Sequence, residues 1–551
     1  MSDEERGPAE RQGLLRAALG ALSGLLAGFG ALAIAELTAA AVRPQSSPVV
    51  AVGGAAIDRT PAAVKDWAIR HFGTSDKLVL QWGIVAVLAS LAVALGVLAA
   101  RFGRVGAAGV LLFGVVGAVA ATGRPDSTGP ADALPSVLGA AAGAPLLYVL
   151  TARLRAAPRE RGTAAGHPAA PADGLDHRGF DRRGLAQRGF DRRGFVRTAT
   201  AAAAASTAAG VAGRALNGSS GKDAVASRAR VTLPGPASPA RPVPARAGLR
   251  IAGSSPFITG NADFYRVDTA LVVPKVDATA WRLRIHGEGV RRPVVHTFDD
   301  LLRRELIERD ITLTCVSNEV GGPYVGNARW IGVRLGDLLA ESGVRPPSKG
   351  GPADQLVARS VDGMTLGTPV EAVMDGRDAM LALGMNGEPL PFAHGFPVRM
   401  VVPGLYGYVS ACKWIEDIEL TTFDAYDPYW VERGWAREAP VKTQSRIDTP
   451  KPFARPRAGT VMVAGVAWAQ HRGIDRVEVR VDDGPWQEAR LAAEDSHDTW
   501  RQWSFPWQAT RGGHTLTVRA TDRTGRPQTD LRTRTIPDGA SGRHSVVVTV
   551  D

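Results

Sequence analysis

Cys315 is one of only two cysteines in a chain of 551 residues, and it stands where a side chain can meet a ligand. It falls at the end of DITLTCV (310–316), a run that predicts a strand, and the following SNEVGG is typical of a loop. A thiolate in that position is a soft ligand for a metal ion. The alternative is a small buried apolar side chain, which is the usual state of a free cysteine.

A second group of polar residues lies further along the chain, between residues 394 and 413. Arg399 follows His394 by five residues in HGFPVR, and Lys413 comes next in CKWIEDIEL. Such cations can hold a phosphate group. Each residue also has an ordinary interpretation, because a guanidinium can pair with a carboxylate and an imidazole can cap a turn. Each ordinary interpretation is reasonable for its own residue, but the two together explain the occurrence of both residues in one motif poorly.

These residues need a folded scaffold, and the chain from about residue 249 onward alternates strand-like and helical patterns irregularly. WRLRIHGEG (281–289) and DITLTCV predict strands. TFDDLLRRELIER (297–309), with Thr297 as its N-cap, and RLGDLLAESG (334–343), closed by Gly343, predict helices. Such a mixture predicts an α+β fold.

Four motifs in this region resemble the molybdopterin-binding domain of the sulfite oxidase family, in the family's order and with similar spacing. They cover about residues 255–440 and read TLTCVSNEVGG…VGNARWIGVRLGDLL, MNGEPLP, HGFPVRMVVPGLYG and KWIEDIEL. The resemblance implies a redox enzyme that carries one molybdenum-molybdopterin per chain. It also implies that Cys315 ligates molybdenum, beside the dithiolene sulfurs of the pterin.

The same resemblance implies which residues bind the cofactor. The family uses the positions of His394, Arg399 and Lys413 on the cofactor. Asp362, in ARSVDG, matches an acid that can accept hydrogen bonds from the pterin ring. Arg266 also matches a family position, but its spacing to Pro274 differs from the family's. The full set of positions is Arg266, Asn318, Asp362, His394, Arg399 and Lys413.

The chain departs from true sulfite oxidases next to the metal ligand. Those enzymes carry Gly-Asn-Arg-Arg after the cysteine, and a basic side chain of that run helps to bind the anion. Here Asn318 remains, while Glu319 and Val320 replace the arginines. Trp435 aligns with a family tyrosine near the metal. An acid in place of a cation disfavours a dianion; the alternative is that Glu319 turns away and pairs with Arg329.

The sequence therefore predicts a molybdenum oxidoreductase that transfers an oxygen atom and two electrons, with Cys315, Glu319 and Trp435 at the reacting centre. Its substrate is expected to be a small oxo donor or acceptor other than sulfite. The alternative is a cofactor-binding sensor or binding protein without turnover. Two cysteines are too few for a four-cysteine iron–sulfur cluster, and neither CxxCH nor a histidine within the apolar N-terminal stretches points to a haem. We therefore expect an unidentified electron carrier as partner.

The first part of the chain, residues 1–160, predicts a multi-pass region in the cell membrane. Four stretches, 14–36, 78–100, 105–122 and 133–152, are long enough to cross a bilayer and are apolar on all sides of a helix. Arginines cluster before the first stretch, between the second and third, and after the fourth, which predicts that these regions face the cytoplasm. The formal net charge of +11 reflects this placement, so no nucleic-acid partner is expected.

Residues 161–248 form a basic segment with a fifth apolar run and a proline-rich linker. In DRRGFVRTATAAAAASTAAGVAGRAL (191–216), Arg192, Arg193 and Phe195 resemble the core of a twin-arginine export signal. The alternative is a basic stop after the fourth span, followed by a surface helix. Export is favoured, and it predicts that the catalytic domain, residues 249–445, is extracytoplasmic. The composition of the linker, 232–248, favours extended polyproline II.

The last part of the chain, residues 446–551, alternates apolar and polar residues in short runs between turn signals such as DDGPW. This pattern predicts an immunoglobulin-like β-sandwich. It also resembles the family's C-terminal dimerisation domain, which implies a homodimer as one arrangement of the protein. Five tryptophans from Trp468 to Trp507 are expected to pack in the core and between domains.

Overall fold

The computed structural model describes residues 8–60, 76–124, 127, 129–155, 192–270 and 272–551. The chain divides into two compact units, Met1–Ser219, here called the helical unit, and Ser220–Asp551, here called the mixed unit.

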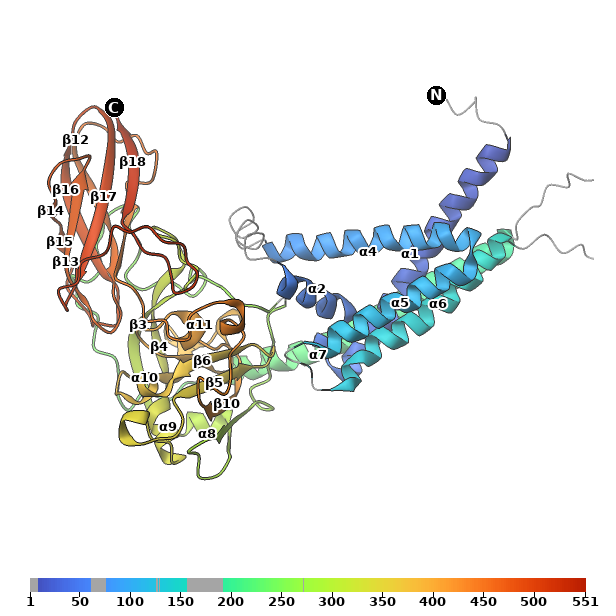
Figure 1. Ribbon diagram of the computed structural model, residues 1–551, viewed down its shortest axis with the longest axis horizontal. Coiled ribbons are helices and arrows are strands. Elements are labelled where there is room, and N and C mark those ends of the chain that lie inside the picture. The colour runs from blue at the N-terminus through green and yellow to red at the C-terminus, as the bar shows by residue number, and fades with distance from the viewer. Residues whose placement is uncertain (1–7, 61–75, 125–126, 128, 156–191, 271) are drawn as a thin grey trace, which may run out of the picture. The chain divides into compact units, whose positions relative to one another are not determined.

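The helical unit confirms the apolar stretches as helices (Figure 1). Four segments are long and apolar enough to cross a membrane: Gln12–Val42, Trp82–Arg101, Gly103–Thr122 and Pro130–Arg155. The helices are α1 (Pro8–Val42), α2 (Pro48–Arg59), α4 (Asp76–Arg101), α5 (Gly103–Thr122) and α6 (Leu134–Arg155). Glycine allows α1 and α4 to approach closely, because a Cβ atom on Gly24 would lie 1.9 Å from the carbonyl oxygen of Ala92.

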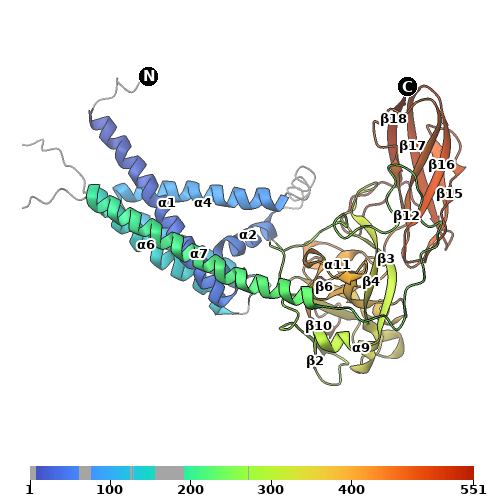
Figure 2. The same cartoon turned by 180° about the vertical axis from the view of Figure 1, so that it is seen from behind.

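Helix α7 (Arg192–Arg230) contains the fifth apolar run and continues beyond its predicted end at residue 216. Near its start, Phe195 is buried against Leu150 and Leu154 of α6. Further along, a Cβ atom on Gly213 would lie 2.9 Å from the backbone nitrogen of Leu37 in α1. Figure 2 shows α7 in green running alongside α6. The fifth run is therefore a helix that packs on the helical unit.

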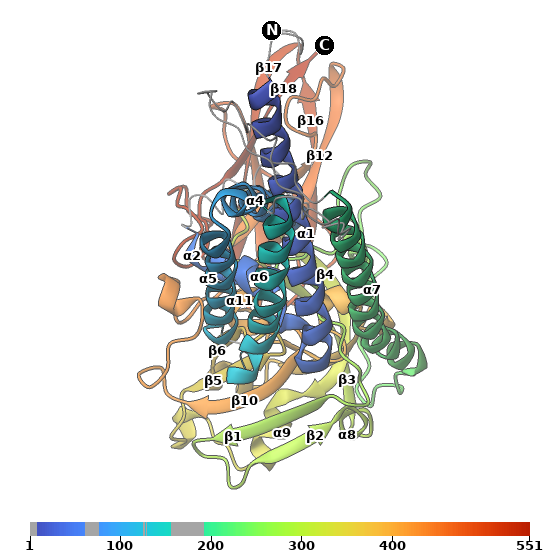
Figure 3. The ribbon, with the colours of Figure 1, turned by 90° about the vertical axis from the view of Figure 1, so that its right-hand side faces the viewer.

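The N-terminal part of the mixed unit is built on two sheets and several short helices, which confirms the mixed helix and sheet class. The first has the order β2-β1-β10-β5-β6, and Figure 3 shows these strands side by side. The second has the order β3-β4-β7-β8, with β9 paired to β7. A hydrophobic core that includes Trp281, Trp330 and Phe396 is shared by both sheets.

The elements of the two sheets have the following bounds. The first sheet contains β1 (Arg282–Gly287), β2 (Val294–Thr297), β5 (Gln355–Ser360), β6 (Thr365–Pro369) and β10 (Ile415–Thr421). The second contains β3 (Leu306–Thr314), β4 (Val325–Arg334), β7 (Met380–Met385), β8 (Glu388–Pro389) and β9 (Arg399–Val401). The short helices are α8 (Phe298–Leu302), α9 (Leu335–Glu341), α10 (Val370–Met374) and α11 (Gly407–Ser410).

The predicted helix over 297–309 is wrong beyond Leu302. Thr297 is the N-cap as expected and forms a capping box with Asp300 at the start of α8, but the helix lasts only five residues. Leu306 then begins β3, which pairs with β4 from Leu306 opposite Val333 to its end. This long-range pairing overrides the local helical pattern. The second predicted helix, α9, is closed as expected by Gly343 at φ +96°.

The proline-rich segment 232–248 contains no regular helix or strand, turns at residues 245–247, and lies along β3. The backbone N–H of Ser238 donates to the carbonyl of Leu306 at 3.2 Å, and that of Glu308 donates to the carbonyl of Ser238 at 2.9 Å. Since β3 is the edge strand of its sheet, this segment covers backbone groups that would otherwise be exposed.

The C-terminal part of the mixed unit contains two four-stranded antiparallel sheets, ordered β11-β12-β16-β15 and β14-β13-β17-β18. Both contribute to one hydrophobic core around Trp503, while Trp468 and Trp500 pack in the core of the first two sheets. The strands are β11 (Gln444–Thr449), β12 (Gly459–Trp468), β13 (Ile474–Val481), β14 (Gln487–Glu488), β15 (Arg490–Leu491), β16 (Arg501–Ala509), β17 (Gly512–Asp522) and β18 (His544–Val550).

Candidate active site

Cys315 lies directly after β3, at the loop end of the β3–β4 hairpin. Its backbone N–H donates to the carbonyl of Tyr324 at 2.9 Å, and its side chain is buried and forms no disulfide. Burial raises the pKa of the Cys315 thiol, while hydrogen bonds from Ser317 and the charge of Lys413 oppose that rise. The thiol therefore stands at a strand end, as the sequence predicts, with a cation within electrostatic range.

The loop after Cys315 is held from two sides. Within the loop, Oδ1 of Asn318 accepts a hydrogen bond from the backbone N–H of Tyr324 at 2.7 Å. From the C-terminal part, Arg446 donates through Nη1 to the carbonyl of Gly322 at 2.8 Å. Gly321 has φ +81°, and a Cβ atom there would lie 2.3 Å from the ring of His544. Asn318 thus braces the loop that presents the thiol.

Arg399, the first residue of β9, is a buried cation in an unusual environment. Its guanidinium lies 4.9 Å from the ring centre of Trp330, and Nη1 donates to the carbonyl of His394 at 3.3 Å. Among the described residues, its Nε has no hydrogen-bond partner and no carboxylate forms an ion pair with it. Burial lowers the pKa of Arg399 to about 10. The carboxylate pairing considered from the sequence is therefore wrong.

His394 is adjacent to this cation and is neutral at physiological pH. Burial, and then the charge of Arg399, lower the pKa of His394 to about 4. Its Nε2 lies 2.9 Å from the carbonyl oxygen of Asn261, so Nε2 carries the proton and Nδ1 keeps a free electron pair. The ring of Phe264 packs against the imidazole edge to face, with the ring centres 5.6 Å apart.

Arg266 and Lys413 are brought together by a residue that the sequence did not single out, Asp268. Nζ of Lys413 lies 2.9 Å from Oδ2 of Asp268, and Nε of Arg266 lies 3.1 Å from the same oxygen. The ammonium of Lys413 also lies 4.7 Å from the ring centre of Trp414. A signal for Asp268 was present in FYRVDT, where it follows Arg266 by two residues.

Asp362 is a half-buried carboxylate on the turn between β5 and β6. It accepts hydrogen bonds from the hydroxyl groups of Thr269 at 3.2 Å and of Ser360. Burial raises the pKa of Asp362, and the charge of Lys413 opposes that rise. Lys413 thus interacts electrostatically with both Asp362 and Cys315, which places these three residues in one region.

Two tyrosines near the thiol were missed by sequence reasoning, although both lie within quoted motifs. Tyr265 interacts electrostatically with both Cys315 and Arg399, and burial raises its pKa strongly. Its ring stacks on Phe264 with the centres 5.1 Å apart. Tyr406 has a pKa raised by burial and, to a lesser extent, by Asp538 and Cys315. Tyr265 therefore links the thiol region with the buried cation.

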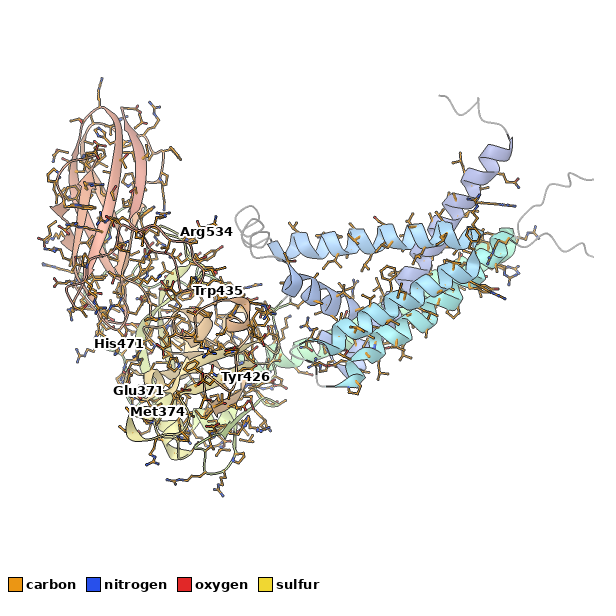
Figure 4. All side chains as sticks on the ribbon, in the orientation of Figure 1. Glu371, Met374, Tyr426, Trp435, His471 and Arg534 are labelled. Carbon is orange, nitrogen blue, oxygen red and sulfur yellow. The ribbon has the colours of Figure 1, made fainter. Side chains whose placement is uncertain are left out.

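Glu319 and Trp435 are placed differently from the residues above. Glu319 is exposed on the loop after Cys315, while Val320 is buried. Arg329, the alternative partner of Glu319, instead pairs with Asp310 through Nη2 at 2.6 Å. Trp435, labelled in Figure 4, packs against Trp430 and Tyr408, with ring centres 5.8 Å and 5.4 Å away.

The donor set of this region fits a molybdenum-molybdopterin. A buried guanidinium that lacks a counter-charge needs an anion, and the terminal phosphate of a pterin supplies one. The buried thiol is a soft ligand, and the neutral imidazole and half-buried carboxylate offer acceptors to a heterocycle.

Comparisons with known proteins agree with this fit. Residues 270–430 match the family model described as the oxidoreductase molybdopterin binding domain. The mitochondrial sulfite oxidase of Rattus norvegicus is 31% identical over 293 residues, covering 45% of this chain and 53% of that protein. The uncharacterized oxidoreductase YuiH of Bacillus subtilis (strain 168) is 31% identical over 159 residues, covering 29% of this chain and 74% of that protein.

Among solved structures, the sulfane dehydrogenase SoxCD from Paracoccus pantotrophus is 26% identical, with a TM-score of 0.46, covering 54% of this chain and 84% of that chain. This chain spans about half the length of the sulfite oxidases that it matches. The matched family region contains Cys315, Arg399 and Lys413, whereas Arg266 and Trp435 fall outside it. The chain belongs to the sulfite oxidase family of molybdopterin-dependent oxidoreductases.

Proposed function

We propose that the protein is a membrane-anchored oxidoreductase whose molybdenum cofactor exchanges an oxygen atom and two electrons with a small extracytoplasmic substrate other than sulfite. The observation that carries the cofactor site is Arg399, a buried cation without a carboxylate partner among the described residues, in the same region as the buried thiol of Cys315. Purified protein is expected to contain about one molybdenum per chain and to release a fluorescent pterin on oxidation. A folded preparation with neither would contradict the proposal.

Each residue of the site has a proposed task. Cys315 holds the metal, and loading replaces the thiol proton, since a metal binds the thiolate. Arg399 and Lys413 hold the phosphate, while Asp362 and His394 accept hydrogen bonds from the heterocycle. Asn318 keeps the thiol in position by bracing its loop. When bound, the molybdenum centre supplies the oxygen-atom and two-electron chemistry.

Electrons are proposed to leave the site to a separate carrier. The chain has only two cysteines, Cys315 and Cys412, which are too few to hold a four-cysteine iron–sulfur cluster. The carrier is therefore a partner protein or a small redox molecule.

Glu319 supports a substrate other than sulfite. Its carboxylate is exposed on the loop after Cys315, and Arg329 is already engaged by Asp310. Wild-type protein is expected to turn over a neutral sulfoxide better than sulfite, because an acid near the entrance repels a dianion. Glu319→Arg should raise kcat/KM for sulfite by about tenfold, equivalent to about 1.4 kcal/mol, and leave the sulfoxide unaffected.

Steady-state kinetics with both substrates test this prediction. Glu319→Gln is the matched control, because it removes the charge without reversing it and should give an intermediate effect. Val320 is left unchanged because it is buried, so an arginine there would disturb the loop. Efficient sulfite oxidation by the wild-type protein would refute the charge argument.

Helix α7 is proposed to act as the export signal and to remain attached to the helical unit afterwards. Its packing on α1 and α6 through Gly213 and Phe195 supports retention, because a helix docked in this way remains part of the folded unit. Because the arginine cluster after the fourth span is expected in the cytoplasm, the export signal in α7 is what carries the following chain to the outer face.

Replacing both Arg192 and Arg193 with lysine is expected to keep the mixed unit in the cytoplasm. The reason is that a twin-arginine signal is read by a receptor as an address, whereas positive charge alone sets membrane topology. A reporter after Asp551 should lose its accessibility to external protease in this variant. Normal export would show that the pair acts only as a charge cluster, and Arg214→Lys, further along α7, serves as the control.

The C-terminal part is proposed to be an immunoglobulin-like domain, residues 446–551, which forms a homodimer in the way the family resemblance implies. Its two four-stranded sheets and their common core support the architecture. The remaining proposed boundaries are 1–160 for the membrane region, 161–248 for the basic segment and linker, and 249–445 for the catalytic domain.

A further inference from the structure

We propose that His471, His497 and Asp498 form a zinc site outside the region around Cys315. One ligand atom from each of these three residues lies within 4.8 Å of the ligand atoms of the other two. Two imidazoles and a carboxylate are ligands that zinc prefers, and three protein ligands leave a fourth position for water.

The separations between the ligand atoms are comparable with those around a single ion. Nδ1 of His471 lies 3.1 Å from Oδ1 of Asp498, and Nε2 of His497 lies 3.7 Å from Oδ2. A tetrahedral zinc ion with bonds of about 2.0–2.1 Å places neighbouring ligand atoms about 3.4 Å apart. The two observed distances go to the two different oxygens of Asp498, and the three ligand atoms lie within 4.8 Å of one another, so binding one ion requires the side chains to move closer together.

The backbone holds these ligands in place before any ion binds. His471 has φ +64°, a conformation that residues other than glycine rarely adopt. It is held there by its own backbone N–H, which donates to Oδ1 of Asp498 at 3.1 Å. The two imidazoles meet edge to face, with the ring centres 5.0 Å apart. A strained residue that the surrounding structure holds in place in this way often marks a functional site.

Other histidines of the mixed unit show what an ordinary pair looks like. His286 with Asp417, and His514 with Asp482, each combine one imidazole with one carboxylate. Across the described parts of the chain, the group at His471 is the one in which three metal-binding side chains converge. The second imidazole, that of His497, distinguishes this group from a simple hydrogen-bonded pair of one histidine and one aspartate.

The surroundings of His471 also suit a cation. The residue lines a cavity of about 470 Å³ whose other lining residues include three acids and two arginines: Glu371, Asp375, Glu438, Arg377 and Arg472. Both arginines are paired, Arg377 with Asp375 and Arg472 with Asp522. Figure 4 labels His471 and Glu371 on the same side of the mixed unit, apart from Trp435.

The proposed zinc site is tied to the strand that presents Cys315. The carbonyl of Asp498 accepts a hydrogen bond from the backbone N–H of Thr312 at 3.0 Å. Gln470, next to His471, donates to the carbonyl of Thr312 at 2.8 Å and to the hydroxyl of Thr314 at 2.9 Å. Because Thr314 precedes Cys315, an ion here fixes the C-terminal sheets against the end of β3 and stabilises the presentation of the thiol.

Zinc titration of the intact, detergent-solubilised and molybdenum-loaded protein tests the proposal. The wild type is expected to retain about one zinc per chain after dialysis, measured by elemental analysis beside molybdenum, and to gain several degrees in Tm on zinc addition. His471→Ala and His497→Ala should each weaken zinc binding by at least about tenfold, since even residues that only orient a ligand contribute that much. Molybdenum content should stay unchanged.

His514→Ala is the matched control, because it removes an imidazole from a single His–Asp pair in the same part of the chain. It should bind zinc like the wild type. Equal Tm values of all variants in the absence of zinc show that each is folded. The proposal is overturned if the wild type retains no zinc at micromolar free concentration, or if the two histidine variants retain as much as the wild type.

Discussion

Cys315→Ser is expected to abolish turnover while most of the pterin remains bound. A hydroxyl is a harder and less readily ionised ligand than a thiol, so it cannot replace a thiolate at a soft site. The other proposed contacts to the cofactor, through Arg399, Lys413 and Asp362, are unaffected by this change. We expect a fall in kcat of at least about a thousandfold, equivalent to about 4 kcal/mol of transition-state stabilisation.

Turnover with a sulfoxide, together with the pterin and molybdenum content of the same preparation, measures this result. Cys412→Ala is the matched control. Cys412 is also buried and burial also raises its pKa strongly, but its closest recorded polar contact is the carbonyl of Lys413 at 3.8 Å. That variant should keep both its metal and its activity. Full turnover in Cys315→Ser would remove the thiol from the reacting centre.

The position of Cys315 at the end of a strand could be predicted from the sequence because the relevant signals are local. An alternating run that ends at a loop with glycines placed Cys315 at the end of β3, which is where it lies. The same local reasoning failed over 306–309. There, helix-forming residues follow a true capping box, and only pairing with β4 reveals a strand.

The remaining site residues depend on contacts between distant parts of the chain. Asp268 contacts its neighbour Arg266 and also Lys413, which lies 145 residues further along the chain. Tyr265 interacts electrostatically with Cys315, from which it is separated in the sequence. His471 and His497 come from separate turns. No local pattern predicts such meetings, whereas a family motif can indicate a residue's role without giving its contacts.

Replacing Arg399 with methionine should separate a cofactor-binding role from a structural one. Burial lowers the pKa of Arg399, which means that the charged side chain costs the cofactor-free fold free energy, on the order of 3 kcal/mol. Methionine fills similar space without that cost. The variant is therefore expected to bind less than about a tenth of the wild-type molybdenum, since charge-assisted bonds to phosphate are strong. Its cofactor-free form should melt at the same temperature as the cofactor-free wild type or higher.

Two further variants complete this test. Arg399→Lys keeps the charge but loses the planar fork, so it should retain part of the cofactor. Arg303→Met removes an arginine whose side chain is 69% exposed and should leave both cofactor content and Tm unchanged. An arginine that merely stabilised the fold would behave in the opposite way, with Arg399→Met melting earlier without cofactor. The sign of the change in Tm of cofactor-free Arg399→Met therefore decides whether the buried charge stabilises the fold or binds the cofactor.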